Sequence, residues 1–236
     1  MSPNFARITG RNGDQSRNSA TQKGIAFGTI MEFDDGREFI FARAGALALE
    51  AGKVMQQAVV TTGHTKDLAV AAAAAIGATS VTITNATTAI TADMYKGGFL
   101  FVNTAAGLGY EYKIKSHPAE STGTGSCVIT LEPDHPLKVA LTTASKVGLR
   151  KHTCDSVIVA PTTPTGVVVG VTVVAVTALY FCWLLKKGTK AVLTNGTLIR
   201  GLGVARSGTT AGAVDVYPLN SVATSGQEHM LGVVQS

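Results

Sequence analysis

The chain has 236 residues, of which 15% are charged and 45% are hydrophobic, and its formal net charge is +5. This length provides a core for one or two domains. The low charge is unusual for a free monomer, because solubility usually depends on surface charge. Three cysteines without a CxxC pair exclude a disulfide framework and fit buried thiols in a reducing cell. Such a composition is natural for a subunit that buries much of its surface in an assembly.

Residues 1–23 are polar and aperiodic, and they lack the apolar region of a signal peptide. We therefore expect an extended N-terminal arm without a core of its own. Basic residues outnumber Asp14 here, and a basic arm can bind nucleic acid or an acidic protein surface. A solvated tail is the equally weighted alternative. Because no nucleic-acid-binding motif accompanies the charges, we expect no direct nucleic-acid contact. The candidate contact residues of this arm are Arg7, Arg11, Arg17 and Lys23.

A β-hairpin is the clearest local signal in the region 24–60. The segment IMEF precedes Asp34-Asp35-Gly36, and the segment REFIFAR follows it. An Asp-Gly turn between alternating apolar and polar residues is typical of a hairpin. Gly45 and Gly52 then predict a brief turn, and a further strand is expected over 53–60.

Residues 61–152 are predicted to form a middle β-rich module of short strands. Residues 68–76 are ambiguous, because five consecutive alanines favour a helix, whereas the shortness of the run and its Val and Thr neighbours favour a strand. One helical turn is expected over 91–96, with Thr91 as its N-cap. The predicted strands, of which the second and third form a hairpin, lie at 80–84, 99–103, 110–116, 127–131 and 146–149.

The most apolar stretch of the chain, Gly166 to Leu185, allows two interpretations. A membrane-spanning helix needs about 20 mainly apolar residues, and aromatic residues and lysines often lie at one end. The many β-branched residues, the two glycines and the nearby Pro161 and Pro164 instead favour a pair of buried strands. We favour strands at 167–174 and 179–185, with a membrane anchor as the alternative. The candidate core or interface anchors are Tyr180, Phe181 and Trp183.

Asn195-Gly196 is the strongest two-residue hairpin signal in the C-terminal region. Short, regularly spaced strands such as these are typical of sandwiches and small barrels. We predict a mainly β fold of short-stranded β-sandwich or small-barrel modules with the extended arm. Further strands are expected at 190–193, 197–204, 212–217 and 229–234. The expected regions are an N-terminal arm (1–23), a β-hairpin region (24–60), a middle β-rich module (61–152) and a C-terminal β-barrel-like domain (153–236).

No motif in the sequence predicts catalysis. The Gly-x-Gly segments lack the spacing and the strand-to-helix context of a phosphate loop, and no Gly-x-Ser-x-Gly elbow occurs. His152, Cys154 and Asp155 are the best metal-like cluster, but further ligands are missing, and a surface His beside a buried thiol is the favoured interpretation. The loop 132–136 carries two carboxylates and a His that nothing orients for acid–base work. We expect no enzyme, no catalytic, cofactor-binding or metal-binding residue, no cofactor and no small-molecule substrate.

Several segments within residues 24–234 follow one another in a distinctive order. They are DDGREFIFARAGALALEAGKVMQ, ITADMYKGGFLFVNTAAGLGYEYKIKSHP, LKVALTTASKVGLR and YFCWLLKKGTKAVL with TNGTLIRGLGV. This order is similar to that of structural proteins from the head-gene region of tailed bacteriophages. The chain thereby resembles capsid decoration (cement) proteins. Proteins of this group are mainly β and often trimeric. They lie on the outer capsid at three-fold positions and hold neighbouring capsomers against the pressure of internal DNA.

The resemblance implies a structural virion protein on the capsid exterior, made in the cytoplasm of the bacterial host. Its expected partners are the major capsid protein and further copies of itself in a homotrimer. The candidate capsid-contacting residues are those of the arm, Arg7, Arg11, Arg17 and Lys23. A cement protein needs wide, largely uncharged interfaces and an arm that becomes ordered on binding. Two alternatives remain open at this point. One is a tail, fibre or spike component that contacts the host, and the other is a small membrane-anchored protein that spans at 166–185.

Overall fold

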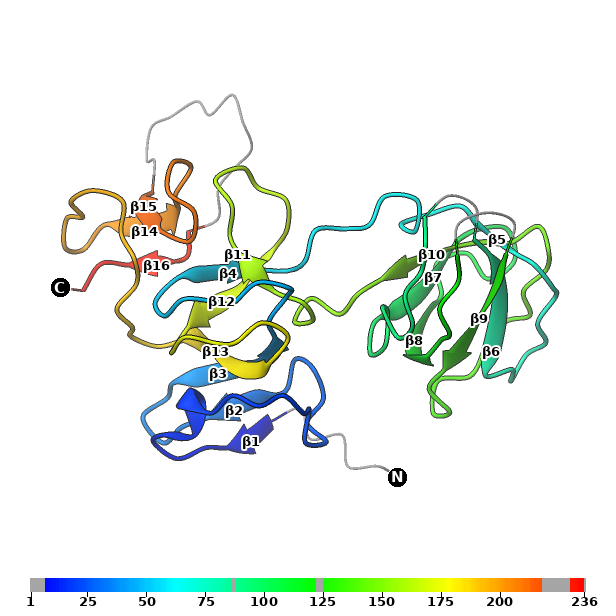
Figure 1. Cartoon of the computed structure of the whole chain (residues 1–236), viewed down its shortest axis with the longest axis horizontal. Coiled ribbons are helices and arrows are strands. Elements are labelled where there is room, and N and C mark those ends of the chain that lie inside the picture. Colours follow the sequence, from blue (N-terminus) through cyan, green and yellow to red (C-terminus); the bar gives the residue numbers. More distant parts are fainter. Residues whose placement is uncertain (1–6, 86–87, 122–124, 218–229, 236) are drawn as a thin grey trace. The chain divides into compact units, whose positions relative to one another are not determined.

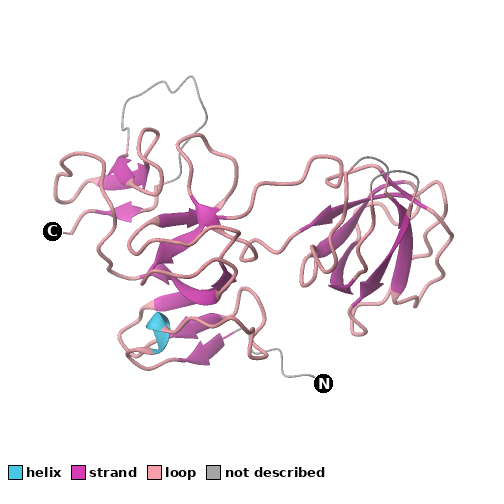
Figure 2. Ribbon diagram, in the orientation of Figure 1, coloured by secondary structure: helices cyan, strands magenta, loops and turns pink. Residues whose placement is uncertain are grey.

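The computed structural model describes the chain with internal gaps, over residues 7–85, 88–121, 125–217 and 230–235. The chain divides into two compact units: unit 1 combines Met1–Val59 with Thr153–Ser236, and unit 2 is Val60–His152. The chain enters unit 2 at Val60 and leaves it after His152, and both positions lie within one residue of the boundaries expected for the middle module. Apart from one short 3-10 helix in unit 1, the described residues of both units form strands and loops (Figures 1 and 2), so the mainly β fold is confirmed.

The main sheet of unit 1 has seven strands. They are β1 (Arg7–Thr9), β2 (Ile30–Glu32), β3 (Glu38–Arg43), β4 (Val54–Gln56), β11 (Ile158–Val159), β12 (Val168–Thr172) and β13 (Phe181–Lys187). Their order is β1-β2-β3-β13-β12-β4-β11, and all neighbours are antiparallel except β1 and β2. The central pair β3–β13 joins the N-terminal hairpin to the C-terminal region within one sheet.

The predicted N-terminal hairpin is confirmed, since β2 and β3 pair across the turn at residues 34–36. Gly36 has a φ of +81°, a left-handed conformation that glycine adopts without steric cost. The side chain of Asp35 accepts hydrogen bonds from the backbone N–H (3.0 Å) and the Nε–H (2.7 Å) of Arg37. The turn therefore satisfies its own polar groups and leaves the strands to pair.

The apolar stretch 166–185 forms β12 and β13, so the membrane-helix alternative is wrong. Leu184 of β13 is fully buried in the sheet core, which explains the lack of charge. A Cβ on Gly170 would lie 2.6 Å from the carbonyl oxygen of Leu185, so the two strands approach too closely for a side chain there. Within the described residues, no helix is both long and apolar enough to cross a membrane.

The expectation of an extended arm is wrong for residues 7–23, which fold onto the sheet of the same unit. Strand β1 pairs with β2, and a short 3-10 helix, η1 (Asp14–Ser16), follows. Ser19 then pairs with Phe181 of β13, and Ile8 packs against the apolar cluster of this sheet. The polar composition of this stretch predicted an unfolded arm, because composition reveals neither the backbone pairing of β1 nor the packing of Ile8. The first six residues of the expected arm lie outside the described residues.

Unit 2 contains a closed barrel of six strands in the order β10-β5-β6-β9-β8-β7. They are β5 (Leu68–Val70), β6 (Ser80–Thr84), β7 (Phe99–Thr104), β8 (Glu111–Ser116), β9 (Ser126–Leu131) and β10 (Lys146–Arg150). Alternation places one face of each strand inside, as in β8, where Tyr112 and Ile114 are buried. The strands and the hairpin predicted for this module are confirmed. Residues 68–70 of the ambiguous run are strand. Residues 92–97 are turns, so the helical turn expected over 91–96 is absent.

The expected C-terminal barrel-like domain is wrong, because β11, β12 and β13 complete the main sheet of unit 1. The remaining strands, β14 (Gly203–Arg206), β15 (Val214–Val216) and β16 (Gly232–Val233), form a small sheet in the order β15-β14-β16. The Asn195-Gly196 hairpin is also wrong, because residues 190–202 contain no strand. The Asn195 side chain instead donates to Thr209 and Asp215, each at 2.8 Å, and fixes this loop to β15.

Candidate interaction pocket

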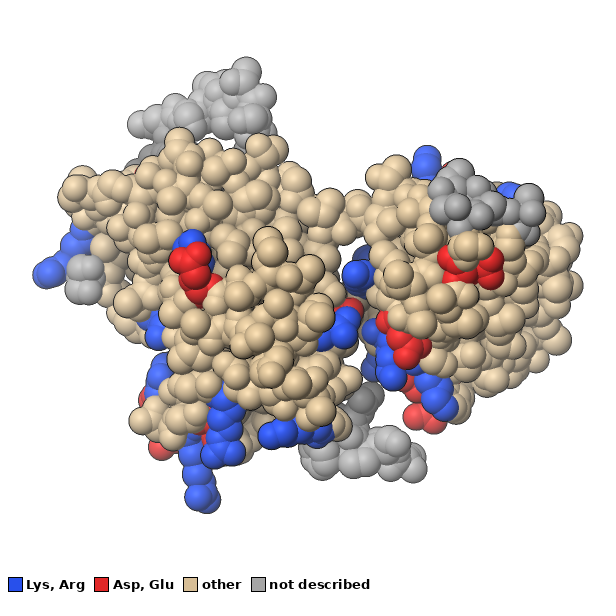
Figure 3. All heavy atoms as spheres, viewed as in Figure 1, with Lys and Arg blue, Asp and Glu red and all other residues tan. Residues whose placement is uncertain are grey.

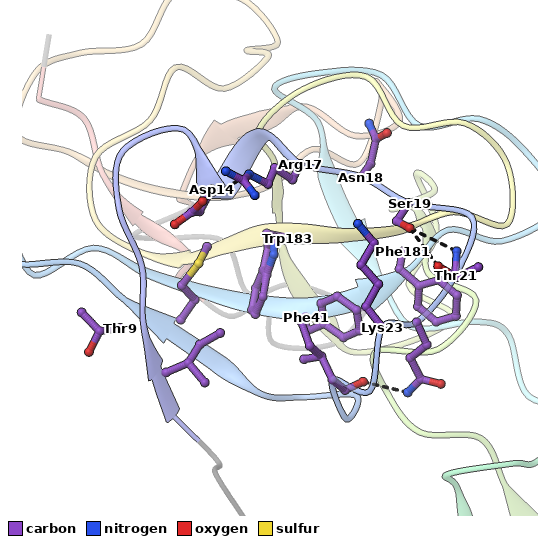
Figure 4. Close-up of a pocket in the computed structure, with 14 residues that line it drawn as sticks. Thr9, Asp14, Arg17, Asn18, Ser19, Thr21, Lys23, Phe41, Phe181 and Trp183 are labelled. Carbon is purple, nitrogen blue, oxygen red and sulfur yellow. Dashed lines mark hydrogen bonds and ion pairs between the residues drawn. The ribbon is translucent and has the colours of Figure 1, made fainter.

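A pocket of about 230 Å³ lies in unit 1 between the N-terminal segment and the main sheet (Figure 4). Its floor contains Phe41 of β3 together with Phe181 and Trp183 of β13. Its rim comes from residues 14–23, which we call the strap. The pocket thus lies where a segment from the start of the chain crosses a strand from near its end. Ile8, Ile25 and Met31 complete its apolar part.

The floor is an aromatic cluster held by strand register. Phe41 and Trp183 are direct partners across β3 and β13, and their ring centroids are 5.0 Å apart in an edge-to-face arrangement. The Phe181 ring stacks on Phe41 at 5.8 Å with an interplanar angle of 9°. Alternation along both strands brings the three rings to one face, and such ring pairs contribute about 0.5–1.5 kcal/mol each beyond burial. All three side chains are less than a tenth exposed, so the protein around them packs closely against the rings.

The strap is held down by its own polar groups. Ser19 and Phe181 exchange backbone hydrogen bonds, and the Asn18 side chain donates to the carbonyl oxygen of Ala175 at 3.2 Å. The Gln22 side chain donates to the carbonyl oxygen of Ile25 at 2.8 Å. These bonds explain how a polar segment lies over aromatic rings: its backbone and side chains find partners without entering the apolar floor.

The rim of the pocket carries more positive than negative charge. Arg17 pairs with Asp14 at 3.2 Å between Nε and Oδ1, and Asp14 also accepts the backbone N–H of Arg11 at 2.9 Å. Lys23 is exposed, has a φ of +51° and forms no ion pair within the described part of the chain. The rim therefore carries two cationic side chains and one carboxylate. This arrangement favours a ligand with a negative group.

The structure brings together Arg17, Lys23, Phe181 and Trp183 of the candidate residues. Arg7 instead pairs with Glu32 at 2.8 Å on the surface of β1 and β2. The exposed Arg11 does not line the pocket. Tyr180 packs against a different apolar cluster of unit 1.

Sequence reasoning missed Phe41 and the strap as parts of one site. Phe41 was visible as an apolar position of the predicted hairpin, and Trp183 as an anchor of a predicted strand. Their meeting depends on the pairing of β3 with β13, which lie far apart in the sequence. Local sequence patterns indicate which face of a strand is buried, but not which distant strand it pairs with. No pattern in the sequence therefore predicted the pocket.

The metal-like cluster and the thiols have structural partners. Asp155 is 1% exposed, and its Oδ1 pairs with Arg43 Nε at 2.7 Å. Burial raises the pKa of the Cys154 thiol to about 11 and that of Cys182 to about 12, so both stay protonated at neutral pH. His152 belongs to unit 2, where its ring stacks on Phe99 at 6.4 Å. The described residues contain no group of three His, Cys, Asp or Glu placed to hold a metal ion.

Unit 2 contains a second polar cluster, in which the histidine nitrogens form hydrogen bonds within the protein. His64 Nδ1 lies 2.7 Å from the Tyr95 hydroxyl, and its Nε2 lies 2.8 Å from the carbonyl oxygen of Thr88. His117 Nε2 accepts the backbone N–H of Tyr95 at 3.0 Å. Burial raises the pKa of Tyr95 to about 12. His117 Nδ1 also forms a hydrogen bond with the carbonyl oxygen of Pro118, so every ring nitrogen of His64 and His117 has a protein partner. The cluster therefore stabilises the barrel rather than binding a ligand.

Comparisons of the chain with protein-family models, with curated proteins and with solved structures found no match. The pocket and the character of the surface are therefore the basis for a functional proposal.

Proposed function

We propose that this chain is a structural virion protein that binds the outer surface of a tailed-phage capsid. In this role it cements neighbouring major capsid protein subunits against the internal pressure of DNA. The observation that carries the proposal is the sparsely charged surface, because only 15% of the residues are charged. Figure 3 shows that most of the drawn surface of each unit is uncharged. A surface of this kind gains stability when an assembly covers it.

Exposed aliphatic side chains on both units support the proposal. Scattered apolar residues are normal on any protein surface, but here they accompany an unusual scarcity of charge. In unit 1, Leu47 is 77% exposed and Val167 is 65% exposed. In unit 2, Ile76 is 69% exposed and Leu108 is 64% exposed. Each unit therefore offers apolar contacts to a neighbour.

Two loops in unit 1 that a hydrogen bond joins expose apolar residues. Leu179 is 59% exposed and has a φ of +66°, a conformation that costs a non-glycine residue roughly 1–2 kcal/mol. Its N–H donates to the carbonyl oxygen of Gly45 at 3.0 Å, which ties it to the loop that carries Leu47. Strained residues that their surroundings hold in place are common at functional sites. This loop pair is our candidate for a capsid contact.

The proposal is tested with phage heads that lack the chain. Purified protein is added, and its co-sedimentation with heads is measured together with the temperature at which the heads release DNA. We expect saturable binding and a higher release temperature with the protein than without it. Cryo-electron microscopy of complete virions supplies the second readout. Density for the chain in the tail or baseplate, with none on the head, would disprove the proposal.

A homotrimer is part of the same proposal, because three copies around a capsid three-fold axis bury equivalent surfaces. Light scattering of the purified protein measures its native mass. A trimer mass in solution, or a trimer formed on heads, supports this arrangement. A monomer both free and bound contradicts it.

The pocket favours a second candidate function, that of a tail, fibre or spike component that contacts host glycans. Aromatic rings below a rim of hydroxyl and amide side chains also suit a sugar ring. Binding of the purified protein to bacterial surface polysaccharide, combined with tail density in virions, would favour this role over capsid cementing.

A further inference from the structure

The size of the pocket in unit 1 limits what it accepts. Its volume of about 230 Å³ is below the range of roughly 300–1,000 Å³ that is typical of sites for drug-sized ligands. A group of one side chain's size fits this space better than a cofactor or a nucleotide. The floor of Phe41, Phe181 and Trp183 offers apolar ring surfaces to such a group. The pocket is therefore suited to a single inserted side chain.

The charges on the rim of the pocket favour one sign of charge beside the inserted side chain. The carboxylate of Asp14 is already engaged by Arg17 and by a backbone N–H. Lys23 retains an ammonium group without an ion-pair partner in the described ranges. A carboxylate beside the inserted side chain would meet this ammonium group, whereas a second cation would be repelled.

We propose that the pocket binds one aromatic or branched aliphatic side chain that has Asp or Glu next to it, presented by the major capsid protein. This inference rests on the proposed function and specifies the chemistry of the partner. The apolar side chain enters against the aromatic floor, and the flanking carboxylate pairs with Lys23. A single such contact is weak, because the pocket is small and its charges are exposed. Repetition around a symmetric lattice makes weak contacts effective through high local concentration.

Trp183 makes the proposal directly measurable, because it is the only tryptophan in the chain and lies in the pocket floor. The probes are three tryptophan-free peptides: acetyl-Asp-Phe-Asp-amide, acetyl-Asp-Ala-Asp-amide and acetyl-Lys-Phe-Lys-amide. Each is titrated into the full chain while the emission of Trp183 is recorded. We expect a saturable change with the first peptide, none with the alanine peptide, and about fivefold weaker binding of the lysine peptide. Equal responses to all three peptides, or no response to the first, would overturn the proposal.

A variant pair isolates the charge. Lys23→Gln removes the ammonium group at the rim and should weaken binding of the Asp-Phe-Asp peptide about threefold. The matched control is Lys190→Gln, because Lys190 is an exposed lysine of the same unit that does not line the pocket. The control should bind like the parent, and circular dichroism checks that both variants fold. Equal weakening in both variants contradicts a specific role for Lys23.

The glycan alternative and the proposed function have separate outcomes. N-acetylglucosamine is titrated in the same assay, and a saturable response to the sugar with none to the Asp-Phe-Asp peptide replaces the side-chain proposal with a glycan site. Peptide binding without attachment to phage heads keeps the pocket inference and disproves the capsid role. Attachment to heads that the peptide does not inhibit, and that Lys23→Gln does not weaken, keeps the capsid role and disproves the pocket as its contact.

Discussion

The backbones of Ser19 and Phe181 form two reciprocal hydrogen bonds, of 3.0 Å from Ser19 N to Phe181 O and 2.8 Å from Phe181 N to Ser19 O. These bonds attach the strap to β13 at the start of the aromatic floor. They also convert a polar N-terminal stretch into one wall of the pocket. The position of the strap, and with it the shape of the pocket, therefore depends in part on this bridge.

Ser19→Pro tests that dependence, because proline has no N–H to donate to Phe181. We expect the free energy of unfolding of unit 1 to fall by about 1–3 kcal/mol, since a partly buried carbonyl loses its donor. Ser19→Ala keeps the backbone bonds and should cost less than about 1 kcal/mol. Urea titrations followed by Trp183 emission measure both variants. Equal loss in the two would show that the hydroxyl group, and not the bridge, stabilises the strap.

Local sequence patterns predicted the pieces of this fold better than their partners. The hairpins β2–β3 and β7–β8, and the pair β12–β13, follow from alternation and turn residues that lie close together in the chain. The pairing of Phe41 with Trp183 joins distant segments, and no local pattern encodes it. The polar composition of the strap concealed its folding for the same reason. The candidate residues were therefore found singly, and the pocket that joins four of them was not.

The turn at Asn195-Gly196 shows a second limit of local patterns. Gly196 does have a positive φ, of +76°, as the hairpin signal requires. Asn195 is not among the residues with positive φ, and its Oδ1 accepts a hydrogen bond from Thr210 at 3.0 Å. Tertiary hydrogen bonds to the Asn195 side chain thus take the place of the two-residue turn. The hairpin signal correctly predicted only the positive φ of Gly196.

Gly170 is expected to tolerate no side chain, because a Cβ there would lie 2.6 Å from the Leu185 carbonyl oxygen. Gly170→Ala should therefore push β12 away from β13 and reduce the free energy of unfolding by about 1–3 kcal/mol. Gly208→Ala is the matched control, since nothing lies within 4 Å of its Cβ position and its φ is not positive. Thermal unfolding of both variants provides the comparison. A Gly170→Ala variant as stable as the control contradicts the close approach.

Tyr95→Phe should destabilise the barrel of unit 2, because it removes the hydroxyl group 2.7 Å from His64 Nδ1. A buried ring nitrogen without a partner costs about 1–3 kcal/mol. Hydrogen exchange measured by mass spectrometry should show faster exchange in the barrel strands and little change in unit 1. Tyr110→Phe serves as the control, since Tyr110 is 42% exposed. If both variants exchange alike, the His64–Tyr95 bond does not stabilise the barrel.

Stability should fall in alkali because buried acids resist ionisation. Burial raises the pKa of Tyr95 from its ordinary 10.0 to about 12, and that of Cys182 from 9.0 to about 12. The folded state therefore binds protons that the unfolded state has already released. The contribution of these groups is complete below about pH 9 and is lost as pH rises toward about 12. Urea midpoints measured from about pH 8 to about pH 11 test this, and Cys182→Ala should make the decline shallower. A flat profile contradicts it.

Arg43 and Asp155 should be strongly coupled, because their 2.7 Å ion pair joins β3 to a buried carboxylate. Arg43→Ala leaves that carboxylate without its charged partner and should cost about 3 kcal/mol in the free energy of unfolding. Asp155→Ala leaves only the guanidinium of Arg43, which is 31% exposed and can be hydrated, so its cost should be smaller. The double variant should be less destabilised than the sum of the two single changes. A double-mutant cycle in urea measures the difference, and simple additivity would show that the pair does not hold β3 to the loop that follows residue 153.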